Sequence, residues 1–206
     1  MTKIDFKREF KHLYSPPKGK FTIVDVPAMN FLMVDGVGYP VGNPSYEQAL
    51  EALYGISYGL KFASKAQGKD YVVPPLEGLW WMEDMSKFSM ARKDEWEWTM
   101  MIMQPEWVIQ YMVDVVLADV AHKKDLPALA KLRFEVYHEG LSVQTFYVGP
   151  YSEEGPTIAS MHAHVEEEGY LLEGKHHEIY LNDARKTAPE KLKTVIRQPI
   201  KKAQGG

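Results

Sequence analysis

The sequence predicts an α+β protein made of two strand–helix–strand–strand units with a helical connector between them. Extended segments flank an amphipathic helix near residues 45–66, and the same order recurs around a second helix near residues 157–168. A separate helical segment at residues 106–122 lies between the two sets. From this pattern we expect two antiparallel sheets or half-sheets packed face to face, with a cleft between the halves, where ligand sites often lie.

The composition excludes several classes of protein. The chain has 206 residues, of which 45% are hydrophobic and 25% are charged, the balance of an ordinary globular protein with one large domain. Its net charge of -4 is spread along the chain, which argues against a nucleic-acid-binding surface. The chain contains no cysteine, so disulfides, thiolate metal sites and a cysteine nucleophile are excluded.

We expect a cytoplasmic protein without a membrane partner. Residues 1–10 carry mixed charge and lack the apolar core of a secretory signal, and no apolar run is long enough to span a bilayer. About 20 residues precede the first extended segment, fewer than a helix-turn-helix domain requires, so we expect no direct binding of nucleic acid. The absence of cysteine is compatible with a reducing cytoplasm.

The first unit begins with two extended segments, Thr22–Val26 and Asn30–Val34, which are separated by Pro27. The glycines and the proline of Asp35–Pro40 then indicate a turn or loop. This loop is not a dinucleotide-binding fingerprint, because the third glycine is missing and no helix opens directly on it.

A helix follows from about Ser45 to about Ala66, and its first residue has two explanations. Ser45 and Gln48 have the spacing of a capping box, in which each side chain bonds the backbone of the other. Alternatively, Pro44 is the first helical residue and Asn43 caps it.

Gly55 and Gly59 are poor helix formers four residues apart, and their spacing suggests that the helix packs closely on a sheet. Extended segments at residues 71–81 and 97–103 complete the first unit. The near-continuous apolar character of residues 97–103 indicates burial on both faces, or one face on the core and one on a ligand.

The second unit repeats the first in outline after the connector helix. The expected elements are a short turn at residues 125–127, strands at 134–137 and 141–148, a helix at 157–168, and strands at 178–181 and 192–196.

We therefore expect a single domain over residues 1–200. Its first module spans about 20–104, its connector helix about 106–124 and its second module about 132–198. Residues 201–206 are expected to form a disordered tail, as chain ends with few apolar residues often do.

A carboxylate lies in the middle of an otherwise hydrophobic strand near the end of the chain. Strand alternation places His176, Glu178 and Tyr180 on one face, and Ile179 and Leu181 on the other. A carboxylate beside aromatic side chains is either a solvated charge at the edge of a sheet or the anchor of a pocket.

Four phrases of the sequence are similar to those of a known family. They are FLMVDGVGYP at residues 31–40, PLEGLWW at 75–81, YVGPY at 147–151 and HHEIYL at 176–181. In these phrases and in their order the chain resembles the GyrI-like small-molecule binding proteins, over roughly residues 20–200. The resemblance implies two strand–helix–strand–strand modules related by pseudo-twofold symmetry. It also implies a ligand cleft of the kind found in the effector domains of multidrug-sensing regulators.

The resemblance also implies a chemistry, because some stand-alone members are hydrolases that open the cyclopropane of DNA-alkylating antibiotics of the yatakemycin and duocarmycin type. The family's pocket carboxylate corresponds to Glu178. Many relatives have a histidine where this chain has Tyr147, so a histidine role does not carry over and Tyr147 becomes the candidate in its place.

The candidate catalytic residues are thus Glu178 and Tyr147. A desolvated carboxylate has a raised pKa and can act as a general base near neutral pH. The phenol of Tyr147 could donate to an oxygen that gains charge as the ring opens, provided that it meets Glu178. A buried phenol that only finds a hydrogen-bond partner is the plain alternative.

Aromatic and methionine side chains are candidates for the walls of a ligand site. Adjacent residues of a strand point to opposite faces, so only one of the two neighbouring tryptophans can face a cleft. Core packing is the alternative role for at least half of the set. The candidate ligand-binding residues are Trp80, Trp81, Trp107, Tyr39, Met33, Tyr180 and His176.

We expect neither a metal nor an organic cofactor. The chain has seven histidines, but His162 and His164 are two residues apart on a helix and do not share a face. His176 and His177 point to opposite faces of a strand, and the sequence contains no His-Glu-x-x-His motif.

Three hypotheses for the function follow. The first is a cofactor-independent hydrolase for cyclopropane-bearing antibiotics. The second is a module that sequesters or senses hydrophobic small molecules without chemistry, and the third is a gyrase-inhibitor-like module that binds a protein. The expected partner is a hydrophobic or polyaromatic small molecule, and both a monomer and a homodimer are compatible with the sequence.

Overall fold

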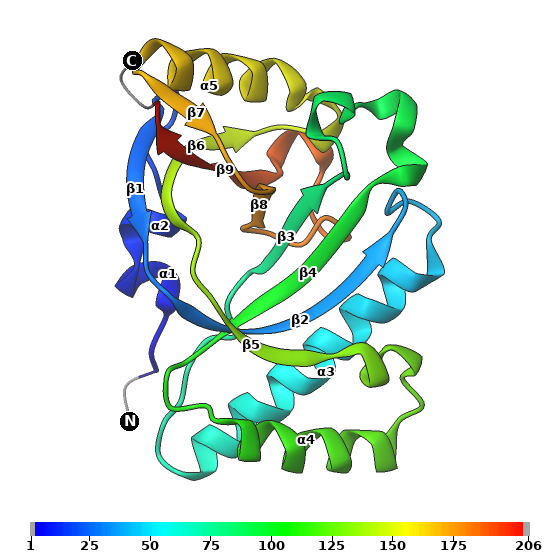
Figure 1. The fold of residues 1–206 in the computed structure, drawn as a ribbon. Helices are drawn as coiled ribbons and strands as arrows, with labels where there is room; N and C mark the ends of the chain where they lie inside the picture. Colours follow the sequence, from blue (N-terminus) through cyan, green and yellow to red (C-terminus); the bar gives the residue numbers. More distant parts are fainter. Residues whose placement is uncertain (1–2, 204–206) are drawn as a thin grey trace. The chain divides into compact units, whose positions relative to one another are not determined.

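The computed structural model describes residues 3–203 and has an α+β fold with antiparallel sheets (Figure 1). The chain forms two compact units. The first unit contains residues 3–9 and 29–137, and the second contains residues 10–28 and 138–203. The described part of the chain contains no helix with the length and apolar character of a bilayer-crossing segment.

The first unit is built on an antiparallel sheet in which the strand order is β3–β4–β2–β5. Seven of the eight residues of β4 are buried, which confirms the burial predicted from its apolar sequence. The strands are β2 (Met29–Val37), β3 (Leu76–Trp81), β4 (Glu97–Gln104) and β5 (Arg133–Tyr137).

Two long helices of the first unit, α3 (Pro44–Ala66) and α4 (Gln110–Lys123), pack against each other (Figure 1). Helix α4 begins later than predicted, because residues 105–109 turn before the helix starts. The shorter helices are α1 (Phe6–Glu9), η1 (Met85–Lys87), η2 (Met90–Glu95) and η3 (Pro127–Lys131).

Helix α3 begins as the second prediction describes, with Pro44 as its first residue and Asn43 as its cap. The side chain of Asn43 accepts a hydrogen bond from the backbone nitrogen of Ser45 over 3.0 Å, and Pro44 occupies the first turn. Asn43 is therefore the cap, and the proline supplies the fixed backbone angle that suits a first helical residue.

The two glycines of α3 face α4 and its following loop, so the prediction that they pack on a sheet was wrong. A Cβ atom added at Gly59 would lie 2.4 Å from Cγ1 of Val116, and one added at Gly55 would lie 3.3 Å from Cδ1 of Leu126. The glycines thus allow two helices to approach closely. Two glycines four residues apart in a helix are equally compatible with helix–helix packing and with packing of the helix on a sheet.

Gly36 lies inside β2 and not in the predicted loop. It pairs with Trp98 of β4, and a Cβ atom at Gly36 would lie 2.1 Å from the indole ring of Trp98. The ring therefore lies across the glycine, and its nitrogen donates a hydrogen bond to the carbonyl of Gly38 over 3.1 Å. A glycine in a strand interior here marks a close approach of a side chain to the backbone.

The second unit has an antiparallel sheet in the order β1–β6–β9–β8, and β7 also pairs with β9. Its strands are β1 (Thr22–Val26), β6 (Gly140–Val148), β7 (Tyr170–Leu172), β8 (His176–Tyr180) and β9 (Lys193–Lys202). Its helices are α2 (Lys11–Tyr14), η4 (Tyr151–Glu153), α5 (Gly155–Glu167) and η5 (Pro189–Lys191).

Helix α5 covers one face of this sheet (Figure 1). Met161 and Val165 of the helix are buried with Val143 of β6 and with Ile196 and Ile200 of β9. The helical spacing of its apolar residues, which predicted an amphipathic helix at residues 157–168, is explained by this contact.

The strand pairing differs from the predicted modules. Strand β1 pairs with β6 and so lies in the second unit, whereas β5 pairs with β2 and lies in the first unit, together with α4. The predicted modules at 20–104 and 132–198 were drawn from the order of the elements along the chain. Strands that are far apart in the chain can nevertheless pair by hydrogen bonds.

The predicted tail also begins too early. Strand β9 continues through Lys201 and Lys202, which pair with Leu171 and Tyr170 of β7. Residues 204–206 lie outside the described part of the chain.

Candidate functional site

Strand β8 places three candidate side chains on one face of the second unit, as strand alternation predicts. The hydroxyl of Tyr180 donates a hydrogen bond to Oε2 of Glu178 over 2.9 Å. Nε2 of His176 lies 3.3 Å from Oε1 of the same carboxylate. The side chain of Glu178 is 16% exposed, so it is an enclosed group and not a solvated edge charge.

The neighbouring strands bring further residues to this face. Tyr180 and Tyr147 are both cross-strand partners of Thr194, on the two sides of β9. Because direct cross-strand partners point to the same face, all three share the face of Glu178. Ile196, the cross-strand partner of Glu178, packs under α5, so the carboxylate lies on the face that this helix covers.

Glu154 adds a second carboxyl group to this face. It stands directly before α5, where its carbonyl accepts a hydrogen bond from the backbone nitrogen of Ile158 over 3.0 Å, and the residue is only 2% exposed. Burial and, after it, the negative charge of nearby Glu178 raise the pKa of Glu154 to about 10, although the hydroxyl of Thr194 opposes the shift. Glu154 is therefore neutral at pH 7.

No pattern in the sequence pointed to Glu154. It follows the exposed Glu153 in a turn, and an acidic residue before a helix is normally assigned to capping. Its side chain makes no capping hydrogen bond here. Only its burial distinguishes it from its neighbour, and burial in a turn has no periodic signal in the sequence.

Three buried polar side-chain atoms in residues 3–203 have no hydrogen-bond partner, and all belong to the second unit. They are Oε1 of Glu154, Oγ1 of Thr194 and Nε2 of His162. Burial lowers the pKa of His162, and the charge of His176 lowers it further. Buried polar atoms are normally paired with protein, water or ligand, so a cluster of unpaired ones indicates a place where another molecule is bound.

Tyr147 does not bond to Glu178. Its hydroxyl donates to the carbonyl of Pro150 over 3.1 Å, which closes the turn that leads toward Glu154. Burial raises the pKa of Tyr147, and the charges of Glu154 and Glu153 raise it further, so the phenol is a donor at neutral pH. The contact with Glu178 on which the donor role of Tyr147 was made conditional is thus not formed by its hydroxyl, which has the Pro150 carbonyl as its partner.

The other face of β8 carries a different network. Oε1 of Glu139 lies 2.8 Å from Nδ1 of His177, and Oε2 accepts from Arg197 over 3.0 Å. Burial alone would raise the pKa of Glu139, but the charges of His177 and Arg197 outweigh it and lower the pKa to about 2. This fully buried group is a structural ion pair, and it confirms that His176 and His177 point to opposite faces.

The candidate wall residues of the first unit fall into separate groups. Trp80 is buried between Tyr46, which stacks on it at 6.4 Å, and Trp96, which contacts its edge at 6.2 Å. Tyr39 contacts the same Trp96 at 6.0 Å. Trp81 is half-buried. Met33 is 3% exposed and belongs to the core.

Trp107 lies in another part of the first unit. Its ring contacts Tyr71 and Phe6, and its nitrogen donates to Oγ of Ser64 near the end of α3. Tyr46 lies in the first turn of α3, about 27 Å from Ser64 at 1.5 Å per residue. Trp107 and Trp80 therefore cannot form one wall. The roles of these residues in ligand binding stay predictions.

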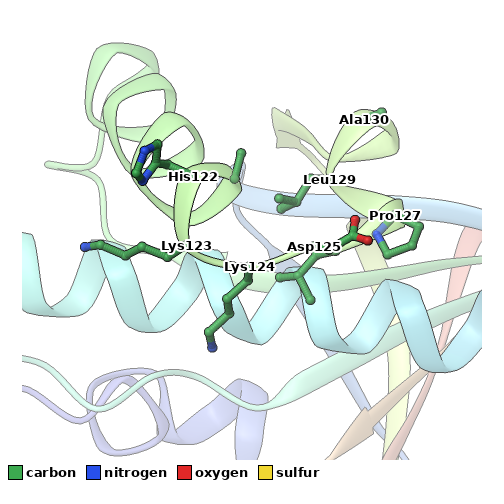
Figure 2. A pocket seen from close by; sticks show the side chains of 9 residues that line it. His122, Lys123, Lys124, Asp125, Pro127, Leu129 and Ala130 are labelled. Carbon is green, nitrogen blue, oxygen red and sulfur yellow. The ribbon is translucent and has the colours of Figure 1, made fainter.

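A shallow depression at the end of α4 is a weaker candidate. Figure 2 shows the nine residues that line it, between Ala121 and Ala130, with Lys123 and Lys124 extending outward. The ammonium group of Lys123 already contacts Asp119 over 2.7 Å. No buried titratable group lines the depression, so the carboxyl cluster of the second unit is the candidate site.

Comparison with known proteins gives a consistent result. The GyrI-like small molecule binding domain matches residues 19–201. A protein from Listeria innocua described as an uncharacterized conserved protein is 42% identical, with 97% of this chain and 100% of that chain covered and a TM-score of 0.90. A hydrolase from the same organism is also 42% identical with the same coverage, at a TM-score of 0.86.

A more distant structure shares the fold. The C-terminal domain of EcmrR is 14% identical, with 89% of this chain and 98% of that chain covered and a TM-score of 0.57. No curated protein matches the chain.

Proposed function

The chain belongs to the GyrI-like small-molecule binding domain family, and we propose that it is a hydrolase that opens the cyclopropane of DNA-alkylating, polyaromatic antibiotics. The observation that carries the proposal is the enclosed carboxylate of Glu178, held by Tyr180 and His176 beside the neutral carboxyl of Glu154. The similarity to Listeria innocua proteins described as hydrolases supports a hydrolytic reaction. Removal of such alkylating compounds would protect the cell's DNA.

Glu178 is the proposed general base. It has two hydrogen-bonding neighbours that fix its orientation, and it lies within a mostly buried face where a bound water would have few competing partners. A positioned base of this kind contributes roughly 10²–10⁴-fold to a rate. The substrate's strained ring is itself reactive, so few catalytic groups are needed.

The proposed reaction consumes one water. Glu178 takes a proton from the water while the oxygen forms a bond to a cyclopropane carbon. The carbon–carbon bond breaks, and its electron pair moves into the conjugated ring, whose carbonyl oxygen becomes a phenolate. That oxygen then takes up one proton, so the product is the substrate plus one water and no cofactor enters the balance.

Tyr147 is proposed as a donor to the developing phenolate. Its phenol is neutral and lies on the face of Glu178, but its hydroxyl already donates to the carbonyl of Pro150. In this role the hydroxyl would exchange that partner for the substrate, at the stage when the charge develops and the new bond is stronger.

The aromatic rings beside Glu178 suit a flat, hydrophobic substrate. Tyr151 contacts the edge of Tyr180 with ring centroids 5.5 Å apart, and 38% of Tyr151 is exposed. A planar ligand could cover this exposed ring while its reactive carbon lies near the carboxylate, so the binding energy would serve to orient it.

Incubation with yatakemycin or a duocarmycin, followed by mass spectrometry over time, tests the proposal. We expect the compound to gain one water at many turnovers per protein, and Glu178→Gln to abolish turnover while ligand binding, measured by equilibrium dialysis, persists. Glu173→Gln is the matched control, because Glu173 is an exposed glutamate of the same unit whose side chain pairs with Lys201, away from this face. Unchanged turnover in Glu178→Gln would exclude the proposed base.

A binding module without chemistry is the second candidate. A carboxylate next to two tyrosine rings is also suited to hold a cation through charge and cation–π attraction. In that case the compound would co-elute with the protein unchanged, and Glu178→Gln would weaken the binding of a cationic aromatic dye more than that of a neutral one.

A further inference from the structure

We propose that Glu154 and Glu178 act as a pair of carboxyl groups that share one proton, and that Glu154 and Thr194 hold the water molecule that Glu178 deprotonates. The inference rests on the proposed hydrolase function and deepens it. It assigns a role to two residues that no sequence signal identifies.

Glu154 is buried without a counter-charge from the described residues. Glu154 is 2% exposed, yet none of the cationic side chains of the described residues forms an ion pair with it. The buried Glu139 of the same unit has both Arg197 and His177 as partners. A buried carboxylate without such partners is costly, whereas a buried carboxylic acid is not.

Glu178 lies close enough to Glu154 to act on its protonation. Its charge and its carboxyl oxygens both act on Glu154 and favour the protonated form. Two carboxyl groups at such a short separation cannot both ionise at neutral pH, so one proton stays between them. Glu178 already has Tyr180 and His176 as neighbours that stabilise its ionised form, so the proton resides on Glu154.

Other charged and titratable groups around Glu154 do not reverse this assignment. The start of α5 favours a negative charge, but this effect is typically below about 1 kcal/mol, and Glu154 makes no capping bond through which to use it. Glu178 of β8 acts on Glu154 directly, and the charge of Glu154 acts on Tyr147 of β6. The other titratable groups of this region are His176 and Tyr180, which contact Glu178, His162 of α5, which lies near His176, and Glu153, the preceding residue. Among them the two histidines alone can carry positive charge, and burial lowers the pKa of His162.

Glu154 and Thr194 together offer the groups that a bound water needs. Thr194 is fully buried and close enough for its hydroxyl to act on the Glu154 carboxyl, yet both Oγ1 of Thr194 and Oε1 of Glu154 lack a hydrogen-bond partner in the described residues. A hydroxyl that can donate and a carboxyl oxygen that can accept form a binding site for one water. Glu178 lies beside this pair and can take the proton from the water they hold.

The neutral state of Glu154 has a clear use in this arrangement. A charged Glu154 would attract the proton of the water as strongly as Glu178 does and would repel the electron pair of the attacking oxygen. A protonated Glu154 orients the water without competing for its proton. The reaction therefore requires one ionised and one protonated carboxyl.

The pH dependence of kcat/KM tests the pair. We expect activity to fall at high pH, near the pKa of about 10, when Glu154 loses its proton. Glu154→Gln keeps the size and the acceptor oxygen of the side chain but cannot ionise. It should therefore remove the alkaline limb near pH 10 and leave only a fall at still higher pH, where the phenol of Tyr147 ionises, at a kcat lowered about tenfold. Glu154→Ala should lower kcat roughly 10²–10³-fold, because the water loses its partner. Glu153→Gln, next in sequence and exposed, should keep the alkaline limb.

Thr194→Val tests the water site separately. The substitution keeps the shape of the side chain and removes only the hydroxyl, so we expect a lower kcat at nearly unchanged KM. Thermal unfolding of each variant shows whether a loss of activity reflects loss of the fold. An unchanged kcat in Thr194→Val would exclude its role in holding the water.

Infrared difference spectroscopy gives a readout that needs no substrate. Wild-type protein at pH 8 should show the carbonyl band of a protonated carboxylic acid, and the band should be absent from Glu154→Gln and present in Glu153→Gln. If this result is obtained and no compound is hydrolysed, the proposal that the two carboxyl groups share one proton is supported, and the proposed hydrolase function is excluded. If hydrolysis depends on Glu178 but Glu154→Gln keeps both the band and the alkaline limb, the hydrolase stands and the carboxyl pair is excluded.

Discussion

The hydroxyl of Tyr180 donates a hydrogen bond of 2.9 Å to the carboxylate of Glu178, two residues earlier on the same face of β8. Strand geometry makes this contact available, because residues two apart on a strand are neighbours on one face. The donor stabilises the ionised carboxylate and sets the direction of its free lone pairs. Five consequences of this and other contacts can be measured.

Tyr180→Phe should lower kcat/KM roughly tenfold at pH 7, because the carboxylate of Glu178 loses a hydrogen bond worth about 1.5–3 kcal/mol that fixes its orientation. Steady-state rates at pH 7 check this. Tyr170→Phe, which removes another half-buried phenol from the second unit, should leave kcat/KM unchanged. An unchanged kcat/KM in Tyr180→Phe would show that this contact does not position the base.

Tyr147→Phe should lower kcat roughly 10²-fold at unchanged substrate affinity if the phenol stabilises the developing phenolate, because such a bond is strong only in the transition state. Steady-state kinetics with a duocarmycin separates kcat from KM. A normal kcat with a lowered melting temperature would instead assign the hydroxyl to its bond with Pro150 alone.

Removal of the Glu139 charge should destabilise the second unit. The pKa of Glu139 is lowered from 4.5 to about 2, so its contribution to the free energy of unfolding is present above pH 4.5 and is lost as the pH falls through about 2. We expect Glu139→Gln to lower the free energy of unfolding by roughly 3–5 kcal/mol at pH 7 and to flatten its dependence on pH in that window.

Urea denaturation at a series of pH values checks this prediction. Glu173→Gln serves as the control, because the exposed pair of Glu173 with Lys201 should contribute less than about 1 kcal/mol. An equal loss in the two variants would contradict the assignment of Glu139 to a structural ion pair.

Gly59→Ala should be destabilising by about 1–3 kcal/mol, because the added methyl group would lie 2.4 Å from a methyl group of Val116. Valine in a helix has one strongly preferred rotamer, so it cannot turn away cheaply. Gly55→Ala meets Leu126 at 3.3 Å and gains up to about 1 kcal/mol of helix propensity, so its melting temperature should stay near wild type.

Glu178→Gln should abolish turnover without preventing ligand binding, because the amide keeps the size of the side chain but is no base. The time course by mass spectrometry described above provides the measurement, with Glu173→Gln as the active control.

Much of the fold could be predicted because its signals are local. Apolar alternation located β6 and β8, and helical spacing located α3 and α5 to within a few residues. The pairing of β1 with β6 could not be predicted, since nothing in either strand specifies its partner. Glycine showed the same limit. Gly59 indicated a close approach without saying what approaches, and Gly36, predicted in a turn, lies in a strand against the ring of Trp98.

The candidate site shows a similar division. Glu178 could be found because strand alternation and the family resemblance both point to it. Glu154 could not, because its significance lies in its burial beside Glu178, and the two residues are brought together by the turn before α5 and by the register of β8 and β9. The bond of Tyr147 to Pro150 depends on the conformation of a turn, which the strand pattern does not describe.

The pairing of β1 with β6 sets an order of events during synthesis. Thr22 pairs with Gln144, which leaves the ribosome 122 residues later, a delay on the order of 10 s at about 5–20 residues per second. During that time every strand of the first unit becomes available, while β1 remains an unpaired edge, open to wrong partners. The nascent chain therefore has a defined interval of vulnerability, and slow translation between β1 and β6 would lengthen it.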